Sequence, residues 1–170
     1  MESIRLKARA KINLGLDVIG RRENGYHDVR MVMQTVGLYD RIIMTRIPEK
    51  EIRIKTNIGF LPVNENNLVY KAIMLMKSKY KLDGGIEVDL NKFIPVAAGM
   101  AGGSSDAASA LFGMNRLYEL NLPMGELMNI GVEIGADVPY CIMRGTALAE
   151  GIGEKLTRLP DMVLKMSMTE

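Results

Sequence analysis

The stretch "IPVAAGMAGGSSDAAS", residues Ile94–Ser109, consists almost entirely of residues with small side chains. Before it, residues 84–95 alternate apolar and polar side chains with a period of two, which indicates a strand. After it, apolar residues recur at helical spacing from Ala107 to Tyr118. A strand, a glycine-rich loop and a helix in this order favour anion binding, because the first N–H groups of a helix lack intrahelical partners and the helix dipole makes that end positive.

The residues alone leave two interpretations of this loop open. No lysine follows the glycines, so the loop is not a Walker A phosphate loop, and it also lacks the dinucleotide pattern G-x-G-x-x-G. In the first interpretation, small residues let a phosphate approach the backbone, and the hydroxyls of Ser104 and Ser105 cap the helix, donate to phosphate or bind Mg²⁺. In the second, the small residues only let the helix pack closely on the strand.

The chain as a whole predicts an α+β fold, in which helices pack on a mixed sheet. Even-numbered positions from Ile4 to Val18 are apolar, which indicates a half-buried strand that is bent or split at this length. The alternation places Arg9, Lys11 and Asn13 together on the other face. We therefore expect Lys11 and Asn13 to line one pocket.

The remaining elements follow from turn residues and periodicity. A turn is expected within "GRRENGYHD", residues 20–28, and strands over the ranges 29–38, 41–47 and 51–58, the first two separated by Tyr39-Asp40. Asn66-Asn67 caps a helix that reaches Tyr80, and a second helix, through Leu127 and Ile134, ends at Gly135. Residues 138–156 predict strands and turns.

The composition is that of one globular domain from a reducing compartment. With 170 residues, 48% of them hydrophobic, the chain can bury a core. The net charge of +2, dispersed along the chain, argues against nucleic acid as a partner. Cys141 is the single cysteine, the N-terminus has no apolar signal segment, and no run reaches the roughly 20 apolar residues of a membrane span. We expect a cytoplasmic protein without a membrane partner.

Three segments together resemble the GHMP kinases. The loop segment "PVAAGMAGGSSDAA" is similar to the phosphate loop of that superfamily. Two others, "AKINLGLDVIGRRENGYHDV" and "GADVPYCIMRGTALAEGIGEKL", resemble the GHMP kinases that phosphorylate 4-diphosphocytidyl-2-C-methyl-D-erythritol in the non-mevalonate route to isoprenoids. The resemblance extends to about Leu159. It implies the GHMP kinase N-terminal domain fold (ribosomal protein S5 domain 2-like), ATP and Mg²⁺ as cofactors, and that small-molecule substrate.

The resemblance also implies roles for the loop residues. ATP would lie along the loop with its phosphates at the backbone N–H groups, and the implied cofactor-binding residues are Pro95, Val96, Ala97, Ala98, Gly99, Met100, Ala101, Gly102, Gly103, Ser104 and Ser105. Ser105 matches the position that contacts Mg²⁺. Ala101 stands where many members have glycine, which the loop tolerates if φ at Ala101 is negative.

A catalytic pair and a substrate site are implied as well. Lys11 in "AKIN" and Asp137 in "GADVP" match the catalytic residues of the family. A carboxylate can orient the substrate hydroxyl and accept its proton, while a nearby ammonium keeps that carboxylate ionised and stabilises the transition state. The substrate would meet Asn13, Tyr26 and His27, the last two at its cytosine base. Taken alone, Asp137 would be a turn cap and Lys11 a solvated strand residue.

The resemblance assigns residues 1–159 to the ATP-binding N-terminal domain and residues 160–170 to the start of a linking segment, with the family's C-terminal domain absent from the sequence. A second copy could cover the apolar surface this leaves, so a homodimer is one expectation. The alternatives are a nucleotide-binding domain without turnover, another GHMP small-molecule kinase and an RNA-binding scaffold. A hydrolase built on Cys141 and His27 lacks any segment that suggests a third catalytic group.

Overall fold

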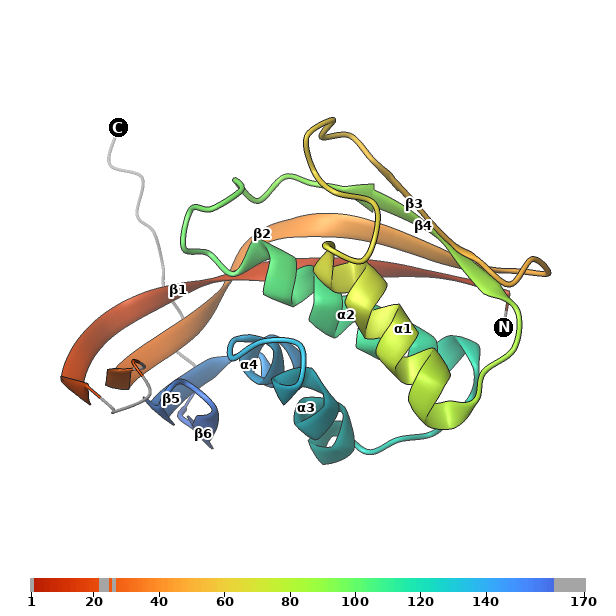
Figure 1. Cartoon of the computed structure of the whole chain (residues 1–170). Helices are drawn as coiled ribbons and strands as arrows, with labels where there is room; N and C mark the ends of the chain where they lie inside the picture. The colour runs from red at the N-terminus through yellow and green to blue at the C-terminus, as the bar shows by residue number, and fades with distance from the viewer. Residues whose placement is uncertain (1, 22–24, 26, 161–170) are drawn as a thin grey trace.

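A computed structural model describes residues 2–21, 25 and 27–160. Within this part of the chain, six strands form one sheet and four helices accompany it (Figure 1). None of these helices has the length and apolar character needed to cross a membrane. The elements in chain order are β1 (Ser3–Arg21), β2 (His27–Ile47), β3 (Ile52–Thr56), α1 (Leu68–Tyr80), β4 (Gly85–Asn91), α2 (Gly102–Leu117), α3 (Met124–Val132), α4 (Val138–Met143), β5 (Thr146–Gly151) and β6 (Lys155–Arg158).

The long strand β2 is the centre of the sheet. Along one edge it pairs antiparallel with β1, and along the other edge it pairs antiparallel with both β5 and β4. The pairing with β5 covers Val29–Gln34 and the pairing with β4 covers Arg41–Ile47, so β4 and β5 separate between these two segments. β3 is parallel to β4, and β6 is antiparallel to β5. The predicted α+β fold with a mixed sheet is therefore confirmed.

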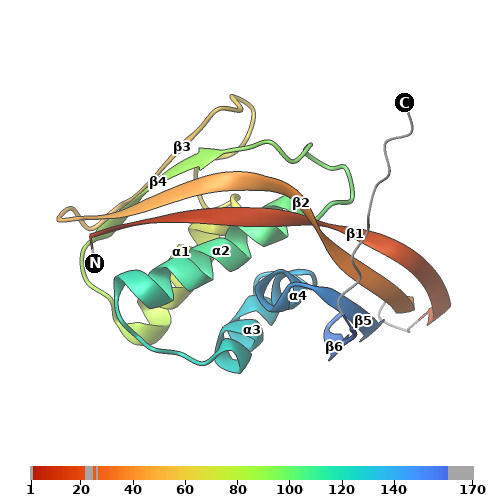
Figure 2. The same ribbon diagram turned by 180° about the vertical axis from the view of Figure 1, so that it is seen from behind.

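Helices α1 and α2 cover one face of the sheet, as the two opposite views show (Figures 1 and 2). α1 begins as predicted, because the side chain of Asn67 accepts a hydrogen bond of 2.8 Å from the N–H of Val69. The buried core joins both helices to the strands, and its largest fully buried apolar side chains include Met33, Ile42, Met44, Ile73, Met76, Ile86, Leu90, Leu111 and Met114.

A bulge in β2 interrupts the regular pairing with β1 beside Lys11. Arg9 stands opposite Tyr39, but Lys11 stands opposite Thr35, so one residue of β1 faces three residues of β2. As a result the adjacent residues Ala10 and Lys11 are both buried, at 0% and 5% exposure. The strict period of two expected for β1 fails at this point, and the lysine lies under the surface instead of on a solvated face.

Two expected boundaries were wrong, and one lies partly outside the described residues. β2 runs without a break through Tyr39 and Asp40, because ionic and hydrogen-bonding partners satisfy the Asp40 carboxylate inside the protein. Within the range 138–156, α4 precedes the strands, and Pro139 fits its first turn, where no backbone donor is needed. The turn expected over 20–28 is shorter, because β1 extends to Arg21 and β2 begins at His27. Between these strands, Gly25 has φ 84°.

Candidate active site

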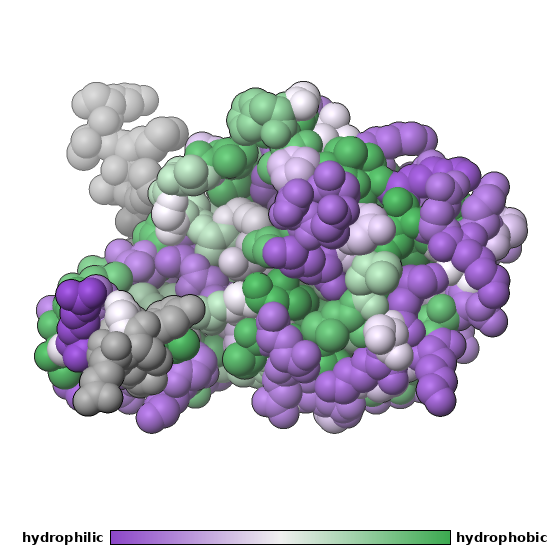
Figure 3. All heavy atoms as spheres, in the orientation of Figure 1, coloured by the Kyte–Doolittle hydropathy of each residue, from purple (hydrophilic) through white to green (hydrophobic). Residues whose placement is uncertain are grey.

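A pocket of about 580 Å³ lies where β4 and β5 separate, within the usual size range of small-molecule sites. Ten of the eleven loop residues expected to bind ATP line it, from Pro95 to Ser104. The side chains of Lys11, Asn13 and Asp137 reach the same pocket, and the remaining lining residues are Leu61, Pro62, Asn66, Asn67, Leu68, Lys92 and Asp106. In Figure 3, pale spheres of weak polarity cover the area where this loop lies in Figure 1, as its Gly and Ala content requires.

The start of α2 offers free backbone donors to this pocket. The N–H of Ser105 donates to the carbonyl of Ala101 at 2.8 Å, and Ala101 makes no side-chain capping bond. The N–H groups of the three preceding residues therefore remain available to an anion. Close packing contributes too, because a Cβ added at Gly102 would lie 3.1 Å from the Ile94 side chain. Both interpretations of the small residues thus apply to the same loop.

The condition under which alanine would be tolerated at position 101, a negative φ, is not met. Ala101 has φ 54° and Ala97 has φ 61°, both in the left-handed region that favours glycine. A non-glycine residue in this conformation costs about 1–2 kcal/mol. The loop therefore holds two strained alanines, and the structure on either side of the loop has to maintain them.

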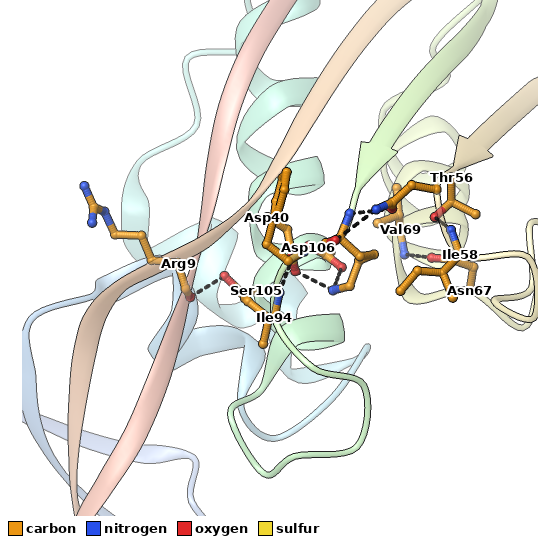
Figure 4. A network of polar contacts seen from close by, with 12 residues as sticks. Arg9, Asp40, Thr56, Ile58, Asn67, Val69, Ile94, Ser105 and Asp106 are labelled. Carbon is orange, nitrogen blue, oxygen red and sulfur yellow. Dashed lines mark hydrogen bonds and ion pairs between the residues drawn. The ribbon is translucent and has the colours of Figure 1, made fainter.

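Ser105 and Ser104 differ in their surroundings. The Ser105 side chain is buried, and its hydroxyl donates to the carbonyl of Arg9 at 2.6 Å, which ties the start of α2 to β1 (Figure 4). Ser105 is absent from the pocket lining, whereas Ser104 belongs to it. The Mg²⁺ contact of Ser105 stays a prediction.

The carboxylate of Asp137 faces the ammonium of Lys11, with 3.8 Å between Oδ2 and Nζ. Lys11 also donates to Oδ1 of Asn13 at 3.1 Å. The Lys11 side chain is 6% exposed and that of Asp137 is 32% exposed, so the pair joins a buried charge to one that a ligand can reach. Asp137 occupies the N-cap position of α4, but its side chain caps nothing, which leaves the carboxylate directed at Lys11.

A hydrogen-bonded bridge fixes α4 relative to β2. Thr35, the cross-strand neighbour of Lys11, contacts the hydroxyl of Tyr140 on α4 at 3.0 Å. The Tyr140 hydroxyl donates to the carbonyl of Gly145 at 2.7 Å, and burial raises the pKa of this phenol. Because Asp137 is the N-cap residue of α4 and Thr35 stands opposite Lys11, this bridge links the segments that carry the two members of the Lys11–Asp137 pair.

Three buried charged residues beside the pocket were not anticipated from the sequence. Lys92 contacts Oδ2 of Asp40, and its Nζ lies 2.6 Å from Oδ2 of Asp106. Oδ1 of Asp106 is buried without a hydrogen-bonding partner in the described structure, and burial raises the pKa of this carboxyl to about 8. The one signal in the sequence was an acidic residue among the alanines of "SSDAAS".

The predicted substrate residues do not all reach the pocket. Asn13 lines it, whereas His27 pairs with Arg21 at the end of the β1–β2 hairpin and is not a lining residue. Tyr26 lies outside the described residues. Burial raises the pKa of the Cys141 thiol to about 12, so this cysteine does not supply the thiolate that a Cys–His hydrolase needs. Among the residues described, no cluster of three His, Cys, Asp or Glu side chains is placed to hold a metal ion.

Comparisons with known proteins show which family and which folds this chain is similar to. Residues 67–145, which include the loop and Asp137, match the family described as GHMP kinases N terminal domain. The fold is similar to that of a 4-(cytidine 5'-diphospho)-2C-methyl-D-erythritol kinase, with a TM-score of 0.80 and 35% identity over 92% of this chain and 55% of that one. A homoserine kinase from Cytophaga hutchinsonii shares the fold at a TM-score of 0.72 and 21% identity, covering 94% of this chain and 52% of that chain.

Curated relatives are more similar in sequence. The 4-diphosphocytidyl-2-C-methyl-D-erythritol kinase of Lachnospira eligens is 94% identical over 162 residues, which are 95% of this chain and 56% of that relative. The kinase of the same name from Lachnoclostridium phytofermentans is 61% identical over 94% of this chain and 55% of its own length. The chain thus spans about half the length of the curated relatives it matches. Along nearly its whole length this chain is similar to these kinases, and residues 67–145 match the N-terminal domain of the GHMP kinases.

Proposed function

We propose that this domain binds ATP along the loop 95–104 and transfers its γ-phosphoryl group to the 2-hydroxyl of 4-diphosphocytidyl-2-C-methyl-D-erythritol. The substrate is taken from the names of relatives that are 94% and 61% identical to this chain. The observation that carries the proposal is the Lys11–Asp137 pair, 3.8 Å apart, in the same pocket as the loop. Phosphoryl transfer needs this combination of a phosphate cradle, a proton acceptor and a nearby positive charge.

Each residue of the pair has a defined task in the proposed reaction. Asp137 is accessible from the pocket, so its carboxylate can orient the substrate hydroxyl and accept the proton as the new P–O bond forms. Lys11 is held by Asn13 and Asp137 and places positive charge beside the reacting atoms. Asn13 also lines the pocket and can contact the substrate there.

The residues present fit both predicted cofactors. The uncapped N-terminus of α2 and the small loop residues suit a polyphosphate, which when bound supplies the group to be transferred. Mg²⁺ prefers oxygen ligands, and Ser104 and Asp137 offer them on the pocket wall, in addition to the predicted contact of Ser105. Bound Mg²⁺ would neutralise phosphate charge during transfer.

A turnover assay tests this proposal on the 170-residue chain itself. The chain is mixed with Mg-ATP and 4-diphosphocytidyl-2-C-methyl-D-erythritol, and phosphorylated product is measured by mass spectrometry, with homoserine and mevalonate as competing substrates. We expect product from the cytidine substrate alone, and none from the Asp137→Asn variant. Equal turnover in that variant would refute the role of Asp137, and preferential turnover of another alcohol would identify a different GHMP substrate.

Nucleotide binding without turnover is the second candidate. It is favoured by one observation, that the loop and the uncapped start of α2 suit a polyphosphate without any part played by the Lys11–Asp137 pair. Calorimetry with a non-hydrolysable ATP analogue, beside the turnover assay, separates the two candidates, because this second function predicts binding with no product.

A further inference from the structure

Asp40 connects the strand β2 to residues 92–94, which lead into the phosphate loop and are called its first stem below. Its side chain is fully buried, and Oδ1 accepts hydrogen bonds from the N–H groups of Phe93 at 2.5 Å and Ile94 at 2.8 Å. Its other oxygen, Oδ2, binds the ammonium of Lys92. One carboxylate therefore holds three consecutive residues that immediately precede Pro95, where the loop begins.

The start of α2, which follows the loop and forms its second stem, is linked to the Asp40 carboxylate through Lys92. The Lys92 ammonium lies 2.6 Å from Oδ2 of Asp106, in the first turns of α2. Figure 4 shows Asp40 reaching toward Ile94 with Asp106 beside it. Residues 94 and 106 thus enclose the loop, and both are fastened to one point on β2.

The position of Asp40 in the sheet suits this task. It is the last residue of β2 before the pairing with β4 starts at Arg41, and its own neighbour on β1 is Ala8. The carboxylate consequently lies at the place where β4 ends and the chain leaves the sheet as a loop. Asp40 does not line the pocket, so it can affect a ligand only through the residues it holds.

Stability alone does not account for such a cluster. Buried ion pairs can often be replaced by apolar residues with no loss of stability, and here Oδ1 of Asp106 is left without a partner in the described structure. The loop, in contrast, contains Ala97 and Ala101 in left-handed conformations. Such strained conformations persist only when the surrounding structure holds the backbone in place. Fixing both stems provides that constraint.

We propose that Asp40 is a positioning residue of the phosphate site, which sets the conformation of the loop by tying both of its stems to β2. The inference rests on the proposed nucleotide binding for its effect on affinity, but not for its effect on the loop itself. A displaced loop would misplace the backbone N–H groups that face the phosphates, and small misplacements have large effects on such sites.

The first test uses the unaltered chain and amide hydrogen exchange resolved by residue. The N–H groups of Phe93 and Ile94 lie outside the strands, yet we expect them to exchange slowly, because a buried carboxylate accepts from both. Val96 and Ala97, which are exposed, provide the comparison within the same loop. Exchange of Phe93 and Ile94 as fast as that of Val96 would overturn the proposal.

The second test compares two ligands in the Asp40→Asn variant. The affinity for a non-hydrolysable ATP analogue is expected to fall on the order of tenfold or more, whereas the affinity for adenosine, which has no phosphate, changes by less than about threefold. Tyr80→Phe is the matched control, because it removes a hydrogen bond of 2.6 Å to Glu126 in a partly buried site away from the pocket lining. It should leave both affinities unchanged.

The outcomes separate the two proposals. Equal weakening of both ligands, or unchanged affinities, would contradict the positioning role of Asp40. If the unaltered chain binds no ATP analogue, the proposed function fails, while slow exchange at Phe93 and Ile94 and its loss in Asp40→Asn still decide whether Asp40 holds the loop. If Asp40→Asn does not fold, Asp106→Asn loosens the second stem alone and is expected to show the same preference for adenosine in a weaker form.

Discussion

Lys11 Nζ lies 3.8 Å from Oδ2 of Asp137, although 126 positions of sequence separate the two residues. The contact arises because Lys11 is buried beside the bulge in β2, and because Asp137 is the N-cap residue of α4. A pair that acts as one unit should respond to mutation non-additively.

Lys11→Met is therefore expected to lower turnover by about 10²-fold or more, because it removes the positive charge next to the transferred group. The double variant Lys11→Met, Asp137→Asn should lose little more than either single variant, since each change already disables the pair. Steady-state kinetics on the four proteins measures this. Multiplicative losses in the double variant would show that the residues act independently.

The bridge between Thr35 and Tyr140 gives a second prediction. Tyr140→Phe removes the hydroxyl that contacts Thr35 and donates to Gly145, and leaves the buried ring in place. We expect unfolding free energy to fall by about 1 kcal/mol. Turnover should fall further than ATP-analogue affinity, because α4 carries Asp137 but not the loop. Chemical denaturation and kinetics check both effects, and Tyr80→Phe controls for the loss of a tyrosine hydroxyl elsewhere.

Much of the fold could be predicted because it depends on local patterns. The alternation before the loop, the Asn67 cap and the apolar stripe of α1 each reflect interactions between residues close in sequence. The continuity of β2 could not be predicted in this way, since an aspartate in a strand normally signals a break. Only its partners from residues 92–94 explain why Asp40 is tolerated there.

The site shows the same limit. The loop residues were identified by their small size, and Lys11 with Asp137 by resemblance. The buried Asp106 was missed because its partner, Lys92, comes from the stem before the loop, and only the folded chain brings the two together. The strain at Ala101 could not be predicted either, because the sequence does not show whether an alanine adopts a positive φ.

That strain leads to a third prediction. Ala101→Gly relieves a left-handed alanine that costs about 1–2 kcal/mol, against roughly 0.5–1 kcal/mol for the greater freedom of glycine in the unfolded chain. We expect a net gain of about 0.5 to 1 kcal/mol in unfolding free energy, measured with urea. Ala98→Gly is the control, because Ala98 lies in the same loop without a positive φ, and it should give no gain. A loss of stability in Ala101→Gly would contradict the strain.

The reactivity of Cys141 gives a fourth prediction. Cys141 is 6% exposed, and burial raises the pKa of its thiol to about 12, so the thiolate is scarce in the folded protein. Alkylation by iodoacetamide at pH 8, followed by mass spectrometry, should be slow in the native chain and fast in urea. Rapid native alkylation would reopen a nucleophilic role for this cysteine.

The last prediction concerns the pH dependence of stability at Asp106. Burial raises the pKa of this carboxyl from 3.8 to about 8, so between these values the folded protein holds a proton that the unfolded chain has lost. Unfolding free energy contributed by this group therefore decreases as pH rises from about 4 to about 8, and levels off above that. Asp106→Asn cannot titrate, so urea unfolding from pH 5 to pH 9 should show a flatter slope. Asp83→Asn, at an exposed carboxyl, should retain the native slope, and an unchanged slope in Asp106→Asn would mean that Asp106 is ionised throughout.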